Sequence, residues 1–102
     1  MLERLKELTK KYDLLQEQLE DPGVYGDSDK LKKLNREIRE LSPVAEAYHR
    51  YEKLQEDCKE AEELLADPEM AEVAKEELFM ARAALDQLEA DLSRKLPEYL
   101  RL

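Results

Sequence analysis

The sequence predicts an all-α fold, an elongated antiparallel bundle of three long helices packed in the manner of a coiled coil. Two observations on composition support this prediction. The chain of 102 residues contains only two glycines and no tryptophan, and charged residues make up 42% of it. Such chains, rich in leucine, glutamate, lysine and alanine, are typical of long packed helices. In addition, apolar residues recur every three or four positions, which is the period of a helix and not of a strand.

The first helix is expected at the start of the chain, over residues 2–19. Its apolar positions follow one another in steps of three and four, so they share one face. The stripe stops at DPGVYGDSD, residues 21–29, which contains both glycines and a proline. This segment is predicted to be a loop. Asp27 or Ser28 can then accept hydrogen bonds from the free amides that open the next helix.

A second apolar stripe runs from Leu31 to Leu65, and Pro43 lies inside it. Proline removes one backbone hydrogen bond and clashes with the preceding turn, which favours a break after Leu41, with Ser42 capping a new helix. The stripe nevertheless keeps its phase across the proline, and a loop between two helices would normally disturb that phase. We therefore expect one long helix kinked at Pro43, with a helix broken there as the alternative.

The third stripe runs from Met70 to Leu92 in near-heptad steps, which suits a coiled-coil seam. Asp67 and Pro68 precede it. Aspartate is a good N-cap, and proline is well tolerated at the first helical position. The pair is therefore expected to start the third helix and to reverse the chain almost without a loop. Because short connections make successive helices antiparallel neighbours, the second and third helices should form a hairpin.

The net charge of −9 is unevenly distributed along the chain. Residues 52–77 hold eleven acids and three lysines, a net charge of −8. This excess disfavours binding of nucleic acid or an anionic membrane by the chain as a whole. A short basic run has two interpretations: solvated charges that pair with acids on neighbouring turns, or a contact surface for RNA or an acidic protein. The run consists of Lys30, Lys32, Lys33, Arg36 and Arg39.

No catalytic, metal or cofactor site is predicted, and no small-molecule substrate. His49 has no cysteine or serine partner at a suitable spacing, and Cys58 lies on an apolar stripe, where cysteine behaves as a small hydrophobic residue. One histidine and one cysteine cannot supply the usual ligands of a transition metal. The lone cysteine and the charged start, MLERLKELTKKY, favour a soluble cytoplasmic chain.

Four segments, taken in order, resemble the amino-terminal domain of bacterial class I peptide chain release factors, and most closely the type that reads UAA and UAG. The resemblance covers nearly the whole chain, and it depends on the order and spacing of the segments because each one alone is helical and unspecific. A segment near the end of the chain, DLSRKLP at residues 91–97, is similar to the place where the family leaves this domain. The four segments are MLERLKELTKKYDLL, LEDPGVYGD, LNREIRELSPVAEAYHRYEKL and EAEELLADPEMAEVAKEEL.

In that family, peptidyl-tRNA hydrolysis depends on a Gly-Gly-Gln loop and codon reading on a tripeptide loop, both in later domains. This sequence has no adjacent glycines, so no catalytic or codon-reading residue can be carried over. We expect residues 1–102 to form a single non-catalytic helical domain, without the catalytic and codon-reading domains. The resemblance implies contact with ribosomal protein and RNA at the base of the stalk, and cooperation with the GTPase release factor. The alternative is a stand-alone coiled-coil adaptor that self-associates, which the apolar Phe79 and Met80 suggest.

Overall fold

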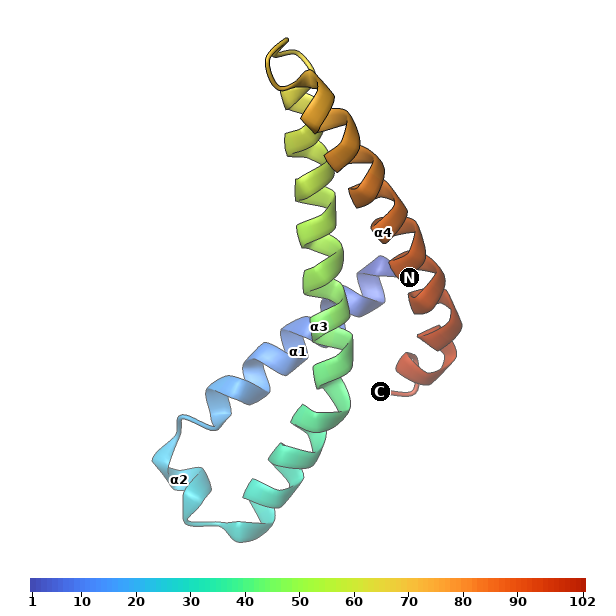
Figure 1. Ribbon diagram of the computed structural model, residues 1–102. Helices are drawn as coiled ribbons and strands as arrows, with labels where there is room; N and C mark the ends of the chain where they lie inside the picture. The colour runs from blue at the N-terminus through green and yellow to red at the C-terminus, as the bar shows by residue number, and fades with distance from the viewer. The chain divides into compact units, whose positions relative to one another are not determined.

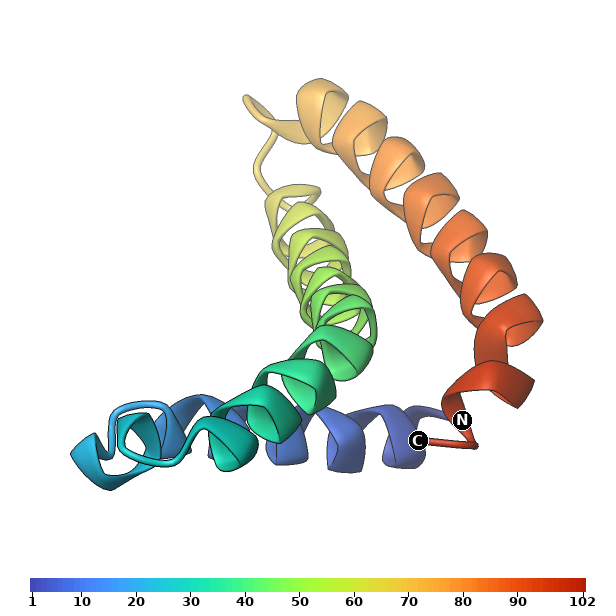
Figure 2. The same ribbon diagram turned by 90° about the horizontal axis from the view of Figure 1, so that it is seen from below.

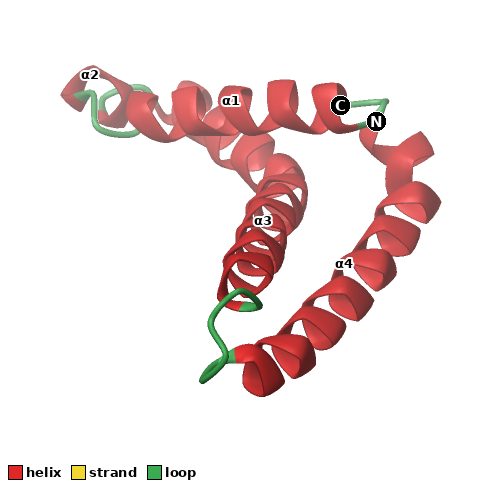
Figure 3. Cartoon of the chain, turned by 90° about the horizontal axis from the view of Figure 1, so that it is seen from above, coloured by secondary structure: helices red, strands yellow, loops and turns green.

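The structure is a computed structural model that describes all residues 1–102. It contains four helices. Figure 3 shows the helices in red and their connections in green, with no strand. The three long helices predicted from the apolar stripes are all present, so the all-α prediction is confirmed. The helices are α1 (Leu2–Gln18), α2 (Pro22–Tyr25), α3 (Ser28–Leu64) and α4 (Ala71–Tyr99).

Helix α3 is continuous for 37 residues, and Pro43 lies inside it. The Ser42 hydroxyl donates to Glu46 Oε1 at 3.3 Å, one turn further on, and so does not cap a new helix. The prediction of one long helix through Pro43 is therefore confirmed, whereas the kink at that residue stays a prediction. Helix α4 likewise continues past a proline, Pro97, to Tyr99.

The chain divides into two compact units. Unit 1 comprises Met1–Tyr48 with Leu96–Leu102, and its core is formed mainly by apolar side chains from α1 and from the first half of α3, with Tyr99 from the end of α4. The buried side chains of unit 1 are Leu5, Leu8, Thr9, Leu15, Leu34, Leu41, Val44, Ala45 and Tyr99.

Two of these buried side chains carry a hydroxyl group. The Thr9 hydroxyl donates to the Leu5 carbonyl at 2.8 Å, which satisfies it inside the core. Burial raises the pKa of the Tyr99 phenol above its usual value, and the nearby Glu98 carboxylate adds to this effect. The Tyr99 side chain is 5% exposed and belongs to the buried apolar core.

Helix α2 was predicted to be part of a loop, and this prediction is wrong at residues 22–25. Asp21 caps this single turn, because its Oδ1 accepts from the Gly23 amide at 2.9 Å. Pro22 occupies the first helical position, where a backbone amide would have no partner within the helix, so its missing N–H costs no hydrogen bond. Figure 2 shows α2 at the turn between α1 and the start of α3. Asp27 then accepts from the amides of Asp29 at 3.1 Å and Lys30 at 3.2 Å, so the predicted cap of α3 is confirmed.

Unit 2, His49–Lys95, is the hairpin of the second half of α3 and most of α4 that the sequence predicted (Figure 1). Arg82 of α4 donates to Glu62 of α3 at 3.0 Å and so joins the two helices by an ion pair. The buried side chains of unit 2 are Tyr51, Ala61, Ala74, Leu78 and Leu92.

The prediction that Asp67 caps the third helix, with Pro68 at its first position, is wrong. Asp67 Oδ1 accepts from the Glu69 amide at 3.0 Å, and the Asp67 carbonyl accepts from the Met70 amide, also at 3.0 Å. These two bonds close a separate four-residue turn. The bond from the Ala74 amide to the Met70 carbonyl, at 2.8 Å, then opens α4, so that helix begins at Ala71 rather than at residue 68.

Replacing Pro43 with alanine should stabilise the protein. Pro43 is exposed, so removing its ring leaves no cavity, and the new amide can donate to the Arg39 carbonyl one turn back. We expect the free energy of unfolding in urea, followed by circular dichroism, to rise by about 1–3 kcal/mol. Glu40→Ala, at another exposed position of α3, should change it by less than about 0.5 kcal/mol. An unchanged or lower stability of Pro43→Ala would contradict a continuous α3.

Truncating Leu5 should destabilise the protein far more than truncating Leu14 in the same helix. Leu5 is 0% exposed, whereas Leu14 is 58% exposed. Leu5→Ala should therefore lower the free energy of unfolding by about 2–5 kcal/mol through lost burial and a new cavity. Leu14→Ala should change it by less than about 1 kcal/mol. Equal effects in the same urea titration would show that the stripe of α1 does not form the core of unit 1.

Candidate functional site

The basic run predicted from the sequence lies in the first three turns of α3, within unit 1. The Asp27 cap fixes where this helix starts, and therefore which way each following side chain leaves the helix. All five basic side chains are exposed. We call this set the basic surface: Lys30, Lys32, Lys33, Arg36 and Arg39.

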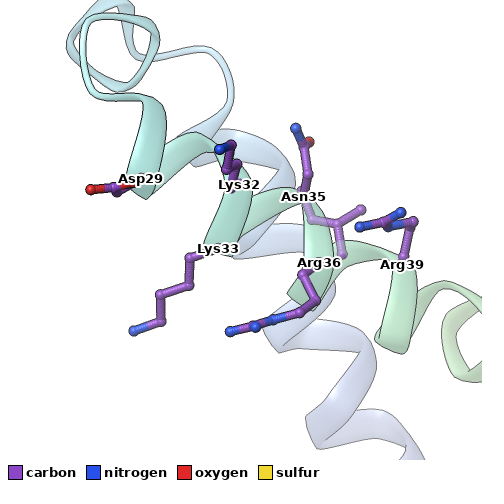
Figure 4. A pocket seen from close by; sticks show the side chains of 7 residues that line it. Asp29, Lys32, Lys33, Asn35, Arg36 and Arg39 are labelled. Carbon is purple, nitrogen blue, oxygen red and sulfur yellow. The ribbon is translucent and has the colours of Figure 1, made fainter.

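Four of the five basic residues line one shallow depression of about 780 Å³ on α3, and Lys30 does not. Figure 4 shows the side chains of Lys33 and Arg36 extending in the same direction from successive turns. The depression also includes Asp29 at its helix-start end, with Asn35 and Ile38. Sequence reasoning missed Asn35, although its spacing of three from Lys32 and four from Arg39 places it on the same side of the helix.

Lys30 instead lines a second depression, of about 440 Å³, which faces α1 and α2. Lys33 lines both depressions and so links them. Two acids, Asp21 and Glu37, line the second depression, so Lys30 lies in a more mixed electrostatic environment than the other four basic residues. The structure thus brings four of the predicted residues together and places the fifth beside them.

None of the five basic side chains forms an ion pair with an acid of the chain. Five ion pairs between lysine or arginine and an acid occur elsewhere, three of which join residues three positions apart on one helix. The interpretation that the basic run pairs with acids on neighbouring turns therefore has no support in the arrangement of these side chains. Their positive charges remain available to a partner.

The chemistry that such a surface offers is the binding of anions. Arginine presents several N–H donors in a planar fork that suits phosphate or carboxylate, and lysine adds a compact positive charge. No nucleophile paired with a base lies among the residues of the depression. Phosphates of a nucleic-acid backbone or carboxylates of an acidic protein are the groups that this surface can hold.

The other residues considered for chemistry lie apart from the basic surface. His49 is exposed, and its Nδ1 lies 3.4 Å from Glu52 Oε1 on the same helix. Cys58 is a half-buried free thiol in unit 2. No group of three or more histidine, cysteine, aspartate or glutamate side chains is arranged to hold a metal ion. None of the four helices has both the length and the apolar character that a membrane span requires.

Comparison with known proteins identifies the family. The PCRF domain family matches residues 8–99 of this chain. Among individual relatives, peptide chain release factor 1 of Geobacter sulfurreducens is 38% identical over 92 residues, which is 90% of this chain. The chain spans 26% of that relative's length. No solved structure matches the chain. Because the family match covers most of the chain, in agreement with the resemblance seen in the sequence, the chain belongs to the PCRF domain family.

Proposed function

We propose that this chain is the non-catalytic helical part of a translation termination factor. The observation that carries this proposal is the match to the PCRF domain family over residues 8–99, together with 38% identity to a peptide chain release factor 1. Because the chain spans only 26% of that relative, its role is proposed as that of one domain, with catalysis and codon reading assigned to other domains. A termination factor of this type works in the cytoplasm.

The resemblance to factors that read UAA and UAG extends this proposal. In those factors, the corresponding domain is expected to meet ribosomal protein and RNA at the base of the stalk and to act with the GTPase release factor. We propose the same contacts here, during peptide release at these two codons.

The basic surface is the part of this chain that we propose for the contact with ribosomal RNA. Its charges are exposed and unpaired, and they stand on a chain whose net charge is −9. A chain with this net charge is repelled by RNA as a whole, so a local cationic surface is needed to orient the approach. Lys32, Lys33, Arg36 and Arg39 supply it within one depression.

A second candidate function is a stand-alone coiled-coil adaptor that associates with itself. The observation in its favour is the exposure of two neighbouring large apolar residues of α4, Phe79 at 76% and Met80 at 70%. Light scattering at high protein concentration distinguishes the two candidates. A strictly monomeric chain would count against the adaptor.

Reversing two charges of the basic surface should weaken binding to ribosomes. In a cosedimentation assay at low salt, we expect Lys32→Glu with Arg36→Glu to weaken binding by about tenfold, because two cationic contacts become repulsive. The logarithm of the binding constant should also fall less steeply with the logarithm of the salt concentration. Circular dichroism should be unchanged, since both residues are exposed and unpaired.

The matched control for this experiment is Lys6→Glu with Lys10→Glu in α1. These lysines are also exposed, unpaired and one helical turn apart, and the change in net charge is the same. Equal loss of binding in both double variants would mean that only net charge matters. Unchanged binding of the Lys32→Glu, Arg36→Glu variant would show that the basic surface consists of solvated charges that do not contact the ribosome.

The purified chain should not hydrolyse peptidyl-tRNA. We expect release of the peptide from ribosomes programmed with a stop codon to stay at the rate without added factor, because no Gly-Gly-Gln sequence occurs in the chain. A full-length class I release factor is the positive control. Hydrolysis above background by this chain would show that it is an enzyme.

A further inference from the structure

Unit 2 contains an apolar groove of about 490 Å³ between α3 and α4, which neither the basic surface nor the proposed function uses. The residues recur at helical spacing along both helices, so each helix contributes one wall. We call it the α3–α4 groove. Its apolar lining residues are Leu54, Ala61, Leu64, Met80, Ala81 and Ala84.

Small residues form the floor of the groove, and longer residues lie along its edges. Ala61, Ala81 and Ala84 have too little side chain to fill the space between the two helices, and Ala61 is only 2% exposed, so it lies at the floor. Leu64 is 36% exposed and Met80 is 70% exposed, so their side chains stand at the edges. Exposed large apolar side chains around a concave apolar floor are the pattern of an interaction site.

The polar residues that line the groove are all acidic. Asp57 and Glu60 come from α3 and Glu77 from α4, and no basic residue lines the groove. Asp57 is held at 2.5 Å by Lys53, whereas Glu60 and Glu77 form no ion pair. Beside the groove, the pKa of Lys53 is raised by its hydrogen bond and charge interaction with Asp57, with smaller contributions from Glu60 and Glu56.

From this combination we propose that the α3–α4 groove binds an amphipathic helix of a partner protein, with apolar residues in the groove and lysine or arginine on both flanks. This is the helix-in-groove mode of recognition, in which apolar side chains at i, i+3 or i+4 and i+7 enter the groove. The unpaired Glu60 and Glu77 stand on opposite walls, so one cationic flank of the incoming helix faces each of them.

Charge complementarity also argues against two other possible ligands of the groove, a second copy of this chain and a nucleic acid. A second copy bound symmetrically, groove to groove, would bring a second acidic surface against the first, and residues 52–77 alone carry a net charge of −8. A nucleic acid would meet the same repulsion. The proposal does not depend on the proposed function, since the groove and the basic surface share no residue.

A synthetic helical peptide of leucine and lysine tests the proposal on the full 102-residue chain. The peptide carries leucine at i, i+3, i+4 and i+7 and one tryptophan on its apolar face. Because the chain has no tryptophan, all tryptophan emission comes from the peptide and reports burial of its apolar face. We expect saturable binding with a blue shift, and no binding of the peptide in which every lysine is replaced by glutamate. Equal binding of the two peptides would overturn the proposal.

Variants at neighbouring positions locate the binding site. Met80→Gln should weaken binding of the lysine peptide by about tenfold, because Met80 lines the groove. Phe79→Gln should leave it unchanged within about twofold, because Phe79 is equally exposed but does not line the groove. Equal losses in these two variants would overturn the proposal, as general adsorption to exposed apolar residues would produce them.

A second pair of variants tests the charge. Glu60→Gln with Glu77→Gln should weaken binding of the lysine peptide by about tenfold and reduce its salt dependence. Glu63→Gln with Asp86→Asn changes the net charge by the same amount at exposed positions outside the groove, and should have a much smaller effect. Equal effects would overturn the proposal. A dimer of the unliganded chain would also overturn the proposal if sedimentation velocity detected it and the Met80→Gln variant abolished it. In that case a second copy of the chain would occupy the groove.

Discussion

Each long helix of this chain can bury only one face, and the rest of the structure depends on that constraint. In unit 1 the buried side chains of α1 and α3 fall at helical spacing, and among them only Thr9 carries a polar group. No charged side chain is buried, and no buried side-chain nitrogen or oxygen lacks a hydrogen-bond partner. With 42% charged residues, all charges must therefore lie on the outer faces, where they form surfaces of one sign or the other.

Aspartate side chains decide where the helices meet their turns. Asp21, Asp27 and Asp67 each accept a hydrogen bond from the backbone amide two residues further on, at 2.9, 3.1 and 3.0 Å. One such residue therefore stands at each of the three connections between helices. The side-chain oxygen replaces a backbone acceptor that a turn cannot provide, which is why aspartate is favoured at these places.

The sequence predicted the elements better than their ends. The apolar stripes identified all three long helices because packing selects one face, and the preserved phase across Pro43 correctly indicated a continuous α3. Asp67 and Pro68 were misplaced because the same residues suit a helix start and an isolated turn, and only the bond from Met70 to Asp67 decides between them. For the basic surface, spacing placed four residues together, but the position of α2 beside Lys30 depends on tertiary structure.

The chain has a net charge of −9, yet it carries two surfaces of opposite sign, the basic surface in unit 1 and the α3–α4 groove in unit 2. The basic surface is cationic, polar and shallow, and offers hydrogen-bond donors to phosphate or carboxylate. The α3–α4 groove is apolar at its floor and acidic at its rim, and offers burial to an apolar side chain and carboxylates to a cation. A ligand suited to one surface is repelled by the other, so each surface discriminates by repulsion as well as by attraction. The two proposals therefore assign this chain partners of opposite charge, one to a surface of each unit.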